Sequence, residues 1–291
     1  MGAEFLQFLF SGVTLGATYA LVGLGFSIIY NASHVINFAQ GEFVMMGGMG
    51  TVFFLGLGLP LPLAILAAIM LTTMFGFALE RFAIAPARGA SVVTLIIITI
   101  GASIVMRGLV QVVWDKEFHS LPAFSGDDPI HIGGATILPQ SLWVLGITVI
   151  LVIALRYFFE KTMMGKAIIA TSLNRDAAML MGINVRFVLF ISFGLSAALG
   201  AAAGILVAPI TLTNFEAGIM LGLKGFCAAI LGGLGNGMGA VAGGLIVGIA
   251  EAMGAGYWMS EYKDAVAFVL ILLVLFFKPS GLFGGRGTER V

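Results

Sequence analysis

Six ionisable residues lie within or beside long apolar stretches of the sequence, where a charge is costly unless another group pairs with it or solvates it. In chain order they are Glu42, Glu80, Arg107, Glu216, Lys224 and Glu251. Each is for that reason a candidate for a solute or ion pathway. We expect four of them to reach an interface or a neighbouring charge at the end of an apolar run, namely Glu80 beside Arg81, Arg107, Glu216 and Lys224. Such a placement does not account for Glu42 or Glu251.

The segment from Asn31 to Glu42 places amides, a histidine and a carboxylate between two apolar runs. On a helix, three of its residues would share one face: Asn37, Gln40 and Gly41. Glu42 would point to another side. One interpretation is that this stripe, with Glu42 nearby, lines a solute pathway. The other is a cytoplasmic turn whose amides cap the helix that follows.

A second unusual segment, 223–248, is rich in glycine. Glycines at 235, 239 and 243 repeat every fourth residue and predict a flat helix face that another backbone can approach. The glycines from 232 to 237 instead predict a helix break. Broken apolar segments in both halves of a chain are typical of transporters with internal repeats, so we place three residues beside the pathway: Gly232, Gly233 and Gly235. Tight helix packing is the alternative.

No motif in the sequence indicates catalysis, a metal site or a cofactor. The glycines after residue 231 are not followed by the Lys-Ser/Thr pair of a phosphate-binding loop, and no G-x-S-x-G elbow is present. The single cysteine, Cys227, and the three histidines lack the spacing of metal ligands. We therefore expect a protein that is not an enzyme and that hydrolyses no ATP by itself.

The composition predicts an all-α, polytopic membrane protein. Hydrophobic residues make up 60% of the 291 residues and charged residues 10%, against about 25% charged residues in soluble domains. Basic and acidic residues balance at 14 each, so no basic excess is present to bind nucleic acid. We expect one membrane domain over residues 1–291, with about eight to ten membrane segments at roughly 20 residues per crossing.

Nine apolar runs are visible, near 5–30, 38–58, 61–79, 91–113, 140–158, 187–208, 217–232, 237–255 and 264–277. The run at 217–232 is short and ends in glycine, so it is a candidate re-entrant half-helix. Basic residues gather at 81–88, at 156–186 and in the tail, where they are Lys278, Arg286 and Arg290; the positive-inside rule makes these segments cytoplasmic. The N-terminus and the acidic loop 114–139, with Asp127, Asp128 and a possible short hairpin, then lie outside.

The cytoplasmic segment 159–186 carries apolar residues at helical spacing. Asn174 or Ser172 can cap a short helix that contains Ala177, Ala178, Leu180 and Met181, and Gly182 suits its end. A short surface helix with an apolar face requires a partner, which is either another protein or the membrane interface.

The residues Asp176-Ala177-Ala178 followed by Gly182 resemble the E-A-A-x-x-x-G coupling loop of ABC importer permeases, with Asp in place of the leading Glu. Three blocks in order, Ile36–Glu42, Gly165–Val185 and Lys224–Gly248, are similar to the permeases of branched-chain amino-acid ABC importers. The closing K-P-S-G-L-F-G at 278–284 also resembles that family.

The resemblance implies a multi-pass permease of the bacterial inner membrane with a cytoplasmic C-terminus. Its expected partners are ATP-binding subunits, a second homologous permease and a periplasmic solute-binding protein, and its expected substrate is a branched-chain or other neutral amino acid. The implied ATPase contact comprises Arg175, Asp176, Ala177, Ala178 and Gly182. Closure of the ATPases would pull the helical segment 166–182 and drive alternating access.

Two other classes of function remain possible at this point. In a self-sufficient channel or ion-coupled carrier for a small polar solute, Glu42, Glu251 and the broken spans would supply coupling or selectivity. A structural membrane subunit would carry no solute, and the polar stripe argues against it.

Overall fold

The structure, a computed structural model, describes residues 2–126, 128–132, 134–257 and 260–284. Asp127 in the loop and Arg286 and Arg290 in the tail, which entered the topology and loop predictions, lie outside these ranges. Apart from one hairpin, the described elements are helices, which confirms the all-α prediction.

Each of the nine apolar runs forms a helix in the part of the chain described. In chain order they are α1 (Gly2–Ser33), α2 (Gln40–Gly56), α3 (Leu61–Ala78), α4 (Val92–Val113), α5 (Pro139–Lys161), α8 (Val185–Thr211), α9 (Ala217–Gly232), α10 (Gly237–Tyr257) and α11 (Lys263–Phe277). Six are long and apolar enough to cross a bilayer: α1, α3 with its π-helical extension η1 (Leu79–Ile84), α4, α5, α8 and α10. Helices α2, α9 and α11 are shorter, at 17, 16 and 15 residues. The chain is a multi-pass helical membrane protein.

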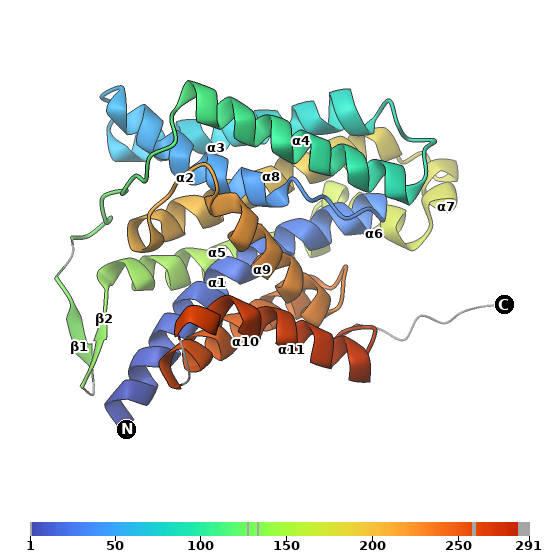
Figure 1. The fold of residues 1–291 in the computed structure, drawn as a ribbon. Helices are drawn as coiled ribbons and strands as arrows, with labels where there is room; N and C mark the ends of the chain where they lie inside the picture. Colours follow the sequence, from blue (N-terminus) through green and yellow to red (C-terminus); the bar gives the residue numbers. More distant parts are fainter. Residues whose placement is uncertain (1, 127, 133, 258–259, 285–291) are drawn as a thin grey trace.

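Two stretches of four helices, α1–α4 and α8–α11, repeat one arrangement. The long first helix of each stretch lies against the second and third helices of the other, so that α1 contacts α9 and α10 while α8 contacts α2 and α3. Helices α1 and α8 also contact each other in the interior (Figure 1). The two halves are thus interlocked, and the internal pseudo-repeat predicted from the two unusual segments is present.

Small residues bring the backbones of the two halves into contact. A Cβ added at Gly12 of α1 would lie 2.7 Å from the Cα atom of Ile249 in α10, and one added at Gly16 would lie 2.8 Å from that of Leu245. Real side chains do not approach so closely, so these positions require glycine. Along α10, Gly239 and Gly243 face the backbone of α9, as their four-residue spacing predicts.

The loop 114–138 and the N-terminal end of α1 lie at one end of the molecule, opposite α7 (Figure 1). The predicted hairpin forms from β1 (Ile130–Ile132) and β2 (Ala135–Ile137), with Ile130 opposite Ile137. The Gln7 side chain of α1 accepts a hydrogen bond from the backbone N–H of Thr136 at 2.7 Å. This contact agrees with the expectation that the N-terminus and the loop share one side.

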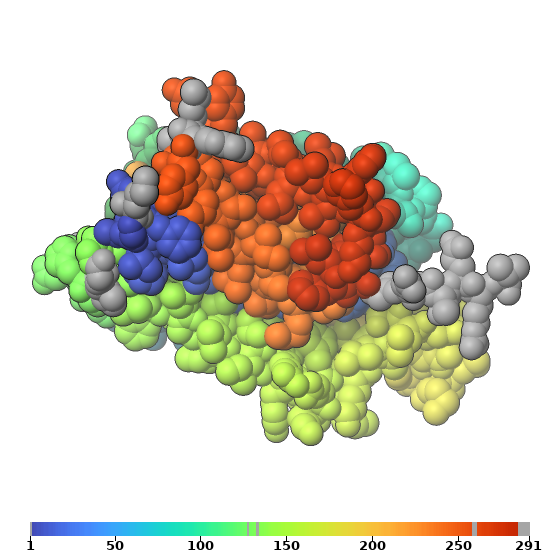
Figure 2. All heavy atoms as spheres, turned by 90° about the horizontal axis from the view of Figure 1, so that it is seen from below, coloured from blue at the N-terminus to red at the C-terminus, as the bar shows by residue number. Residues whose placement is uncertain are grey.

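The segment between α5 and α8 forms two helices, α6 (Met163–Leu173) and α7 (Arg175–Leu180). The prediction of one continuous helical segment over 166–182 was therefore wrong. The helix breaks at Asn174, whose backbone is extended and whose side chain caps α7. A 3₁₀ turn, η2 (Ser260–Tyr262), precedes α11. Figure 2 shows α10 and α11 covering one face, with α5 and α6 along its edge.

Candidate functional site

The two short helices α2 and α9 begin inside the bundle, after the chain turns back from a long helix. His34 turns it after α1, and Leu212 turns it after α8, with positive φ angles of 56° and 62° that non-glycine residues rarely adopt. The starts of α2 and α9 then meet, because a Cβ added at Gly41 would lie 3.0 Å from the carbonyl carbon of Gly218. Two helix N-termini therefore face one region from opposite halves of the molecule.

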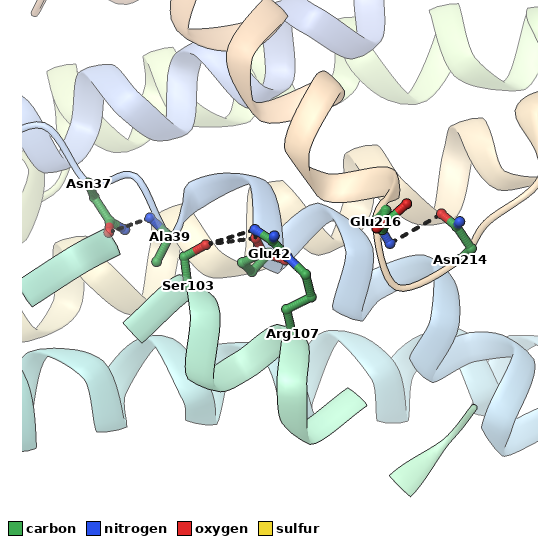
Figure 3. Close-up of polar contacts among 7 residues, drawn as sticks. All are labelled: Asn37, Ala39, Glu42, Ser103, Arg107, Asn214 and Glu216. Atoms are coloured by element: carbon green, nitrogen blue, oxygen red, sulfur yellow. Dashed lines mark hydrogen bonds and ion pairs between the residues drawn. The ribbon is translucent and has the colours of Figure 1, made fainter. Parts of the chain in front are cut away.

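The same asparagine turn precedes both short helices. The Asn37 Oδ1 accepts a hydrogen bond from the N–H of Ala39 at 3.1 Å, and Asn214 Oδ1 accepts one from the N–H of Glu216 at 3.2 Å (Figure 3). The pattern N-F-x-x-G occurs at 37–41 and again at 214–218. The sequence analysis missed this repeat, although a search for the short pattern in both halves would have found it. The Asn37 bond closes the turn before α2, but no side chain caps the helix itself, whose N-cap residue is Ala39, so the capping interpretation is not confirmed. The buried Nδ2 of Asn37 has no hydrogen-bond partner.

Gln40 joins three helices. Its Nε2 donates to the carbonyl of Ser196 at 3.2 Å, and its Oε1 accepts from Ser196 Oγ at 2.6 Å. The same Oγ lies 2.9 Å from the carbonyl oxygen of Gly25 in α1. Gln40 is fully buried in this network of α1, α2 and α8, and it lines neither the cavity beside Glu42 nor the small one beside Asn37.

Glu42 holds a buried ion pair between α2 and α4. Its Oε1 accepts from Ser103 Oγ at 2.8 Å and from Arg107 Nη2 at 2.7 Å (Figure 3). Only 2% of the Glu42 side chain is exposed, against 28% for Arg107. The expectation that Arg107 reaches out to the interface was wrong, because its guanidinium turns inward to this carboxylate. The Oε2 of Glu42 and the Nε of Arg107 are buried without partners.

A cavity of about 170 Å³ lies beside this ion pair, between α1, α2, α4 and α9. Its polar wall is formed by Gly41, Glu42, Ser103, Arg107 and Gly218. Its other walls are mainly apolar, with Phe26, Phe38 and Phe226 among them. Of the residues predicted for the pathway, the structure brings Gly41 and Glu42 into this cavity. Asn37 lines a separate small one.

The second half contains a buried cluster around Lys224. The Nζ atom donates to Glu251 Oε1 and to Asp264 Oδ1, both at 2.6 Å, and Tyr19 donates to Glu251 Oε2 at 2.9 Å. The side chain of Lys224 is 7% exposed, so its expected place at an interface was wrong. The charge of Glu251, for which the sequence offered no partner or interface, is compensated by the Lys224 ammonium group.

The other two ionisable residues have local explanations. Glu80 pairs with Arg88 rather than with the adjacent Arg81, because residues 79–84 wind as a π-helix and the following turn brings Arg88 back. The backbone N–H of Glu216 donates to Asn214 in the turn before α9, and its side chain is exposed at that turn. Neither lines the cavity beside Glu42.

The predicted break at 232–237 is present as the turn between α9 and α10, with positive φ at Gly233 and Gly235. The C-terminal segment covers it, since Leu282 donates its N–H to the carbonyl of Leu231 at 2.7 Å. Gly235 accepts from Asn31 Nδ2 at 2.8 Å and lines a cavity of about 260 Å³ between α1, α5 and α10. Gly232, Gly233 and Gly235 therefore lie apart from the cavity that contains Gly41 and Glu42.

Helix α7 carries the predicted coupling residues. Asn174 Oδ1 accepts from the N–H of Ala177 at 2.9 Å, and Gly182 ends the helix with a φ of 85°. Ala178 faces inward, whereas Leu180 and Met181 are 88% and 83% exposed. Arg175 lines a cavity of about 30 Å³ together with Asn37, so α7 and the turn before α2 share a wall.

Comparison with known proteins identifies the family. A family model described as the permease component of the branched-chain amino acid transport system matches residues 8–275. The chain belongs to this family. The permease LivH of Escherichia coli K12 is 35% identical over 303 residues, which cover 99% of this chain and 98% of the relative. LivH of Salmonella typhimurium and BraD of Pseudomonas aeruginosa, each named a high-affinity branched-chain amino acid transport system permease protein, are 34% identical over the same shares.

Among solved structures, PsaBC from Streptococcus pneumoniae in complex with Fab is similar, with a TM-score of 0.53 and 14% identity. The match covers 96% of this chain and 97% of the other. At this identity the likeness concerns the fold alone. It indicates that the arrangement of helices described here occurs in another protein with a different sequence.

Proposed function

We propose that this permease is the inner-membrane subunit of an ATP-driven importer that receives its solute from a binding protein and translocates branched-chain or other neutral amino acids. The family match over nearly the whole chain supports the transport role. One observation carries the ATP-driven part: a capped helix, α7, presents exposed apolar residues at the end of the molecule opposite the hairpin. Such a surface requires a partner.

The partner of α7 in this proposal is an ATP-binding subunit. Leu180 and Met181 supply an apolar contact, and Arg175 and Asp176 begin the same helix with charged groups. Because Ala178 packs inward and Gly182 fixes the exit of the chain, a displacement of α7 is passed to α8 rather than absorbed by a flexible loop. ATP hydrolysis itself takes place on the partner subunits.

The route from α7 to the interior is short. Arg175 and Asn37 line one small cavity, and Asn37 closes the turn from which α2 starts. Motion of α7 therefore acts on α8 directly and on the start of α2 through this contact. A tilt of α2 relative to α9 changes access to the region where their N-termini meet, which is alternating access in physical terms.

The remaining partners follow from the same proposal. A second homologous permease completes the membrane part, and a periplasmic solute-binding protein docks at the end that carries the hairpin and the exposed Asp128. The segment from Lys278 onward is cytoplasmic, on the side of α7. The whole chain, 1–291, acts as one permease domain.

Gly182→Val tests the coupling role. A positive φ is strained for any residue with a Cβ, so the substitution distorts the end of α7. We expect ATP-dependent leucine uptake by the reconstituted importer to fall at least tenfold, with the variant still present in the membrane. The matched control is Gly89→Val in another polar loop, where a Cβ meets nothing within 4 Å and no positive φ is present. Normal uptake by Gly182→Val would contradict the coupling role.

A self-sufficient carrier makes the opposite prediction. It requires carboxylates free to bind a coupling ion, whereas both oxygens of Glu251 are already bound here, one by Lys224 and the other by Tyr19. Leucine uptake by the purified chain alone under an ion gradient, without ATP, would overturn the proposed function.

A further inference from the structure

We propose that the cavity between α2, α4 and α9 binds the zwitterionic part of an amino acid, with Glu42 as the acceptor of its ammonium group. The inference rests on the proposed function and adds a site within the membrane domain. Three features of the cavity carry it: an incompletely satisfied ion pair, two helix N-termini at its wall, and an apolar remainder.

The ion pair has capacity for a ligand. Glu42 is 2% exposed, and its Oε1 already accepts from Ser103 and Arg107, while its Oε2 has no partner. A buried carboxylate oxygen without a hydrogen bond is costly, and an ammonium donor that enters from the adjoining cavity and displaces the atoms now covering Oε2 would satisfy it. The Nε of Arg107 is buried and unpartnered too. Both the anionic and the cationic residue of this pair therefore have one atom without a hydrogen-bond partner.

The carboxylate of the ligand has a matching environment. Gly41 and Gly218, the second residues of α2 and α9, both line the cavity. Helix N-termini carry partial positive charge and backbone N–H groups, which favour an anionic group. Glycine at both positions lets the two helix starts pack directly against each other, because a Cβ at Gly41 would meet the backbone of Gly218 and a Cβ at Gly218 would meet that of Gly41. The guanidinium of Arg107 adds positive charge to this side.

The balance of charge selects a zwitterion. Glu42 and Arg107 together are neutral, so a ligand with one positive and one negative group leaves the buried site neutral. A pure cation or a pure anion would leave an uncompensated charge in a region of low polarity. The ordinary neutral α-amino acids meet this condition.

The rest of the cavity fits an aliphatic side chain. Phe26, Phe38 and Phe226 line it together with Ile100 and Leu223. The volume of about 170 Å³ exceeds that of several water molecules at about 30 Å³ each, which suits one small amino acid and not a peptide. Apolar walls with a few polar groups at one end are typical of small-molecule sites.

Protection of a thiol at the mouth of the cavity tests the proposal. Ile219 lines the cavity and is half-buried, so Ile219→Cys in a Cys227→Ala background places one thiol there. In the complete importer we expect leucine to slow its modification by a water-soluble thiol reagent several-fold. Glu117→Cys in the exposed loop is the control for consumption of the reagent, and its modification should not change.

Two analogues test recognition of the zwitterion. The compound 4-methylpentanoate lacks the ammonium group of leucine, and leucinamide lacks its carboxylate. We expect neither to protect the thiol at concentrations at which leucine does. Equal protection by all three compounds, or none by leucine, would overturn the proposal.

Two substitutions test the place of binding. In the Ile219→Cys background, Glu42→Gln removes the charge but keeps the shape, and we expect it to raise the leucine concentration for half-protection about tenfold or more. An unchanged rate of modification without leucine would show that the cavity is intact. Ile100 lines the cavity, so Ile100→Trp should fill it and abolish protection. Ile104 lies on the same helix, does not line the cavity and is 63% exposed, so Ile104→Trp should leave protection unchanged.

ATP-dependent uptake measured on the same preparations separates this inference from the proposed function. Uptake without protection by leucine would overturn the site alone. Protection without ATP-dependent uptake would support the site and contradict the proposed function.

Discussion

In each half of the molecule a short helix carries a buried charged residue that pairs with a later helix of the same stretch, but the two ion pairs differ in how many of their atoms have partners. In the second half, Lys224 is held by two carboxylates, and one of these also accepts from Tyr19. In the first half, Glu42 and Arg107 each keep an unpartnered atom beside a cavity. The cluster around Lys224 therefore joins its helices with every charged group paired, whereas the pair around Glu42 is the one to which we assign a ligand.

The largest expected effect lies in the complete cluster. Lys224→Met leaves Glu251 buried with Tyr19 as its remaining partner, and loss of one member of a buried pair costs about 3–5 kcal/mol. We expect a large fall in the thermal unfolding temperature of the detergent-purified protein. The double variant Lys224→Met/Glu251→Leu should recover much of this loss, because no charge is left alone at position 251. A double variant as unstable as the single one would contradict the pairing.

The two asparagine turns allow a like-for-like comparison. Asn37→Ala and Asn214→Ala each remove one hydrogen bond to a backbone N–H, for which caps suggest a cost of about 0.5–2 kcal/mol. We expect similar losses of stability from both. Only Asn37 lies beside Arg175 of α7, so only its variant should also reduce ATP-dependent uptake. Equal reduction by both variants would remove the proposed route from α7 to α2.

The smallest expected effect concerns the loop at the hairpin end. His119 donates to Asp115, which holds the pKa of this exposed carboxyl below its ordinary value, and the backbone of His119 pairs with Thr213 before α9. A lowered pKa means that the contact stabilises the loop above the ordinary Asp pKa and is lost as the pH falls through the lower value. Proteolysis of the loop should therefore quicken slightly in acid. In Asp115→Asn this dependence on pH should disappear, and its persistence would assign it to another group.

Much of the fold was predictable because a bilayer constrains sequence strongly. Each long apolar run became a helix, and the hairpin, the cap at Asn174 and the stop at Gly182 followed from local preferences. The start of α7 at Asn174 was one of the two caps predicted, whereas the separate helix α6 before it was not predicted, because the apolar pattern continues across Asn174.

The ion pairs were beyond the sequence analysis. Glu42 and Arg107 are 65 positions apart, and Lys224 and Glu251 are 27 apart, so their pairing depends on how the helices are arranged in space. Placement near the end of a run suggested exposure for Arg107 and Lys224, but a nearby carboxylate outweighed the pull of the interface. Gln40 likewise shared a predicted face with Gly41, yet Ser196 of α8 binds it away from the cavity.

In the function proposed here, this permease imports amino acids with energy that partner ATPases supply through α7. To test this, the chain is purified with its co-purifying subunits and reconstituted with the binding protein, and leucine uptake is measured with and without ATP for the unaltered chain and for Gly182→Val. We expect ATP-dependent uptake that Gly182→Val lowers at least tenfold while the subunits still co-purify. Uptake independent of ATP, or uptake unaffected by Gly182→Val, would contradict it.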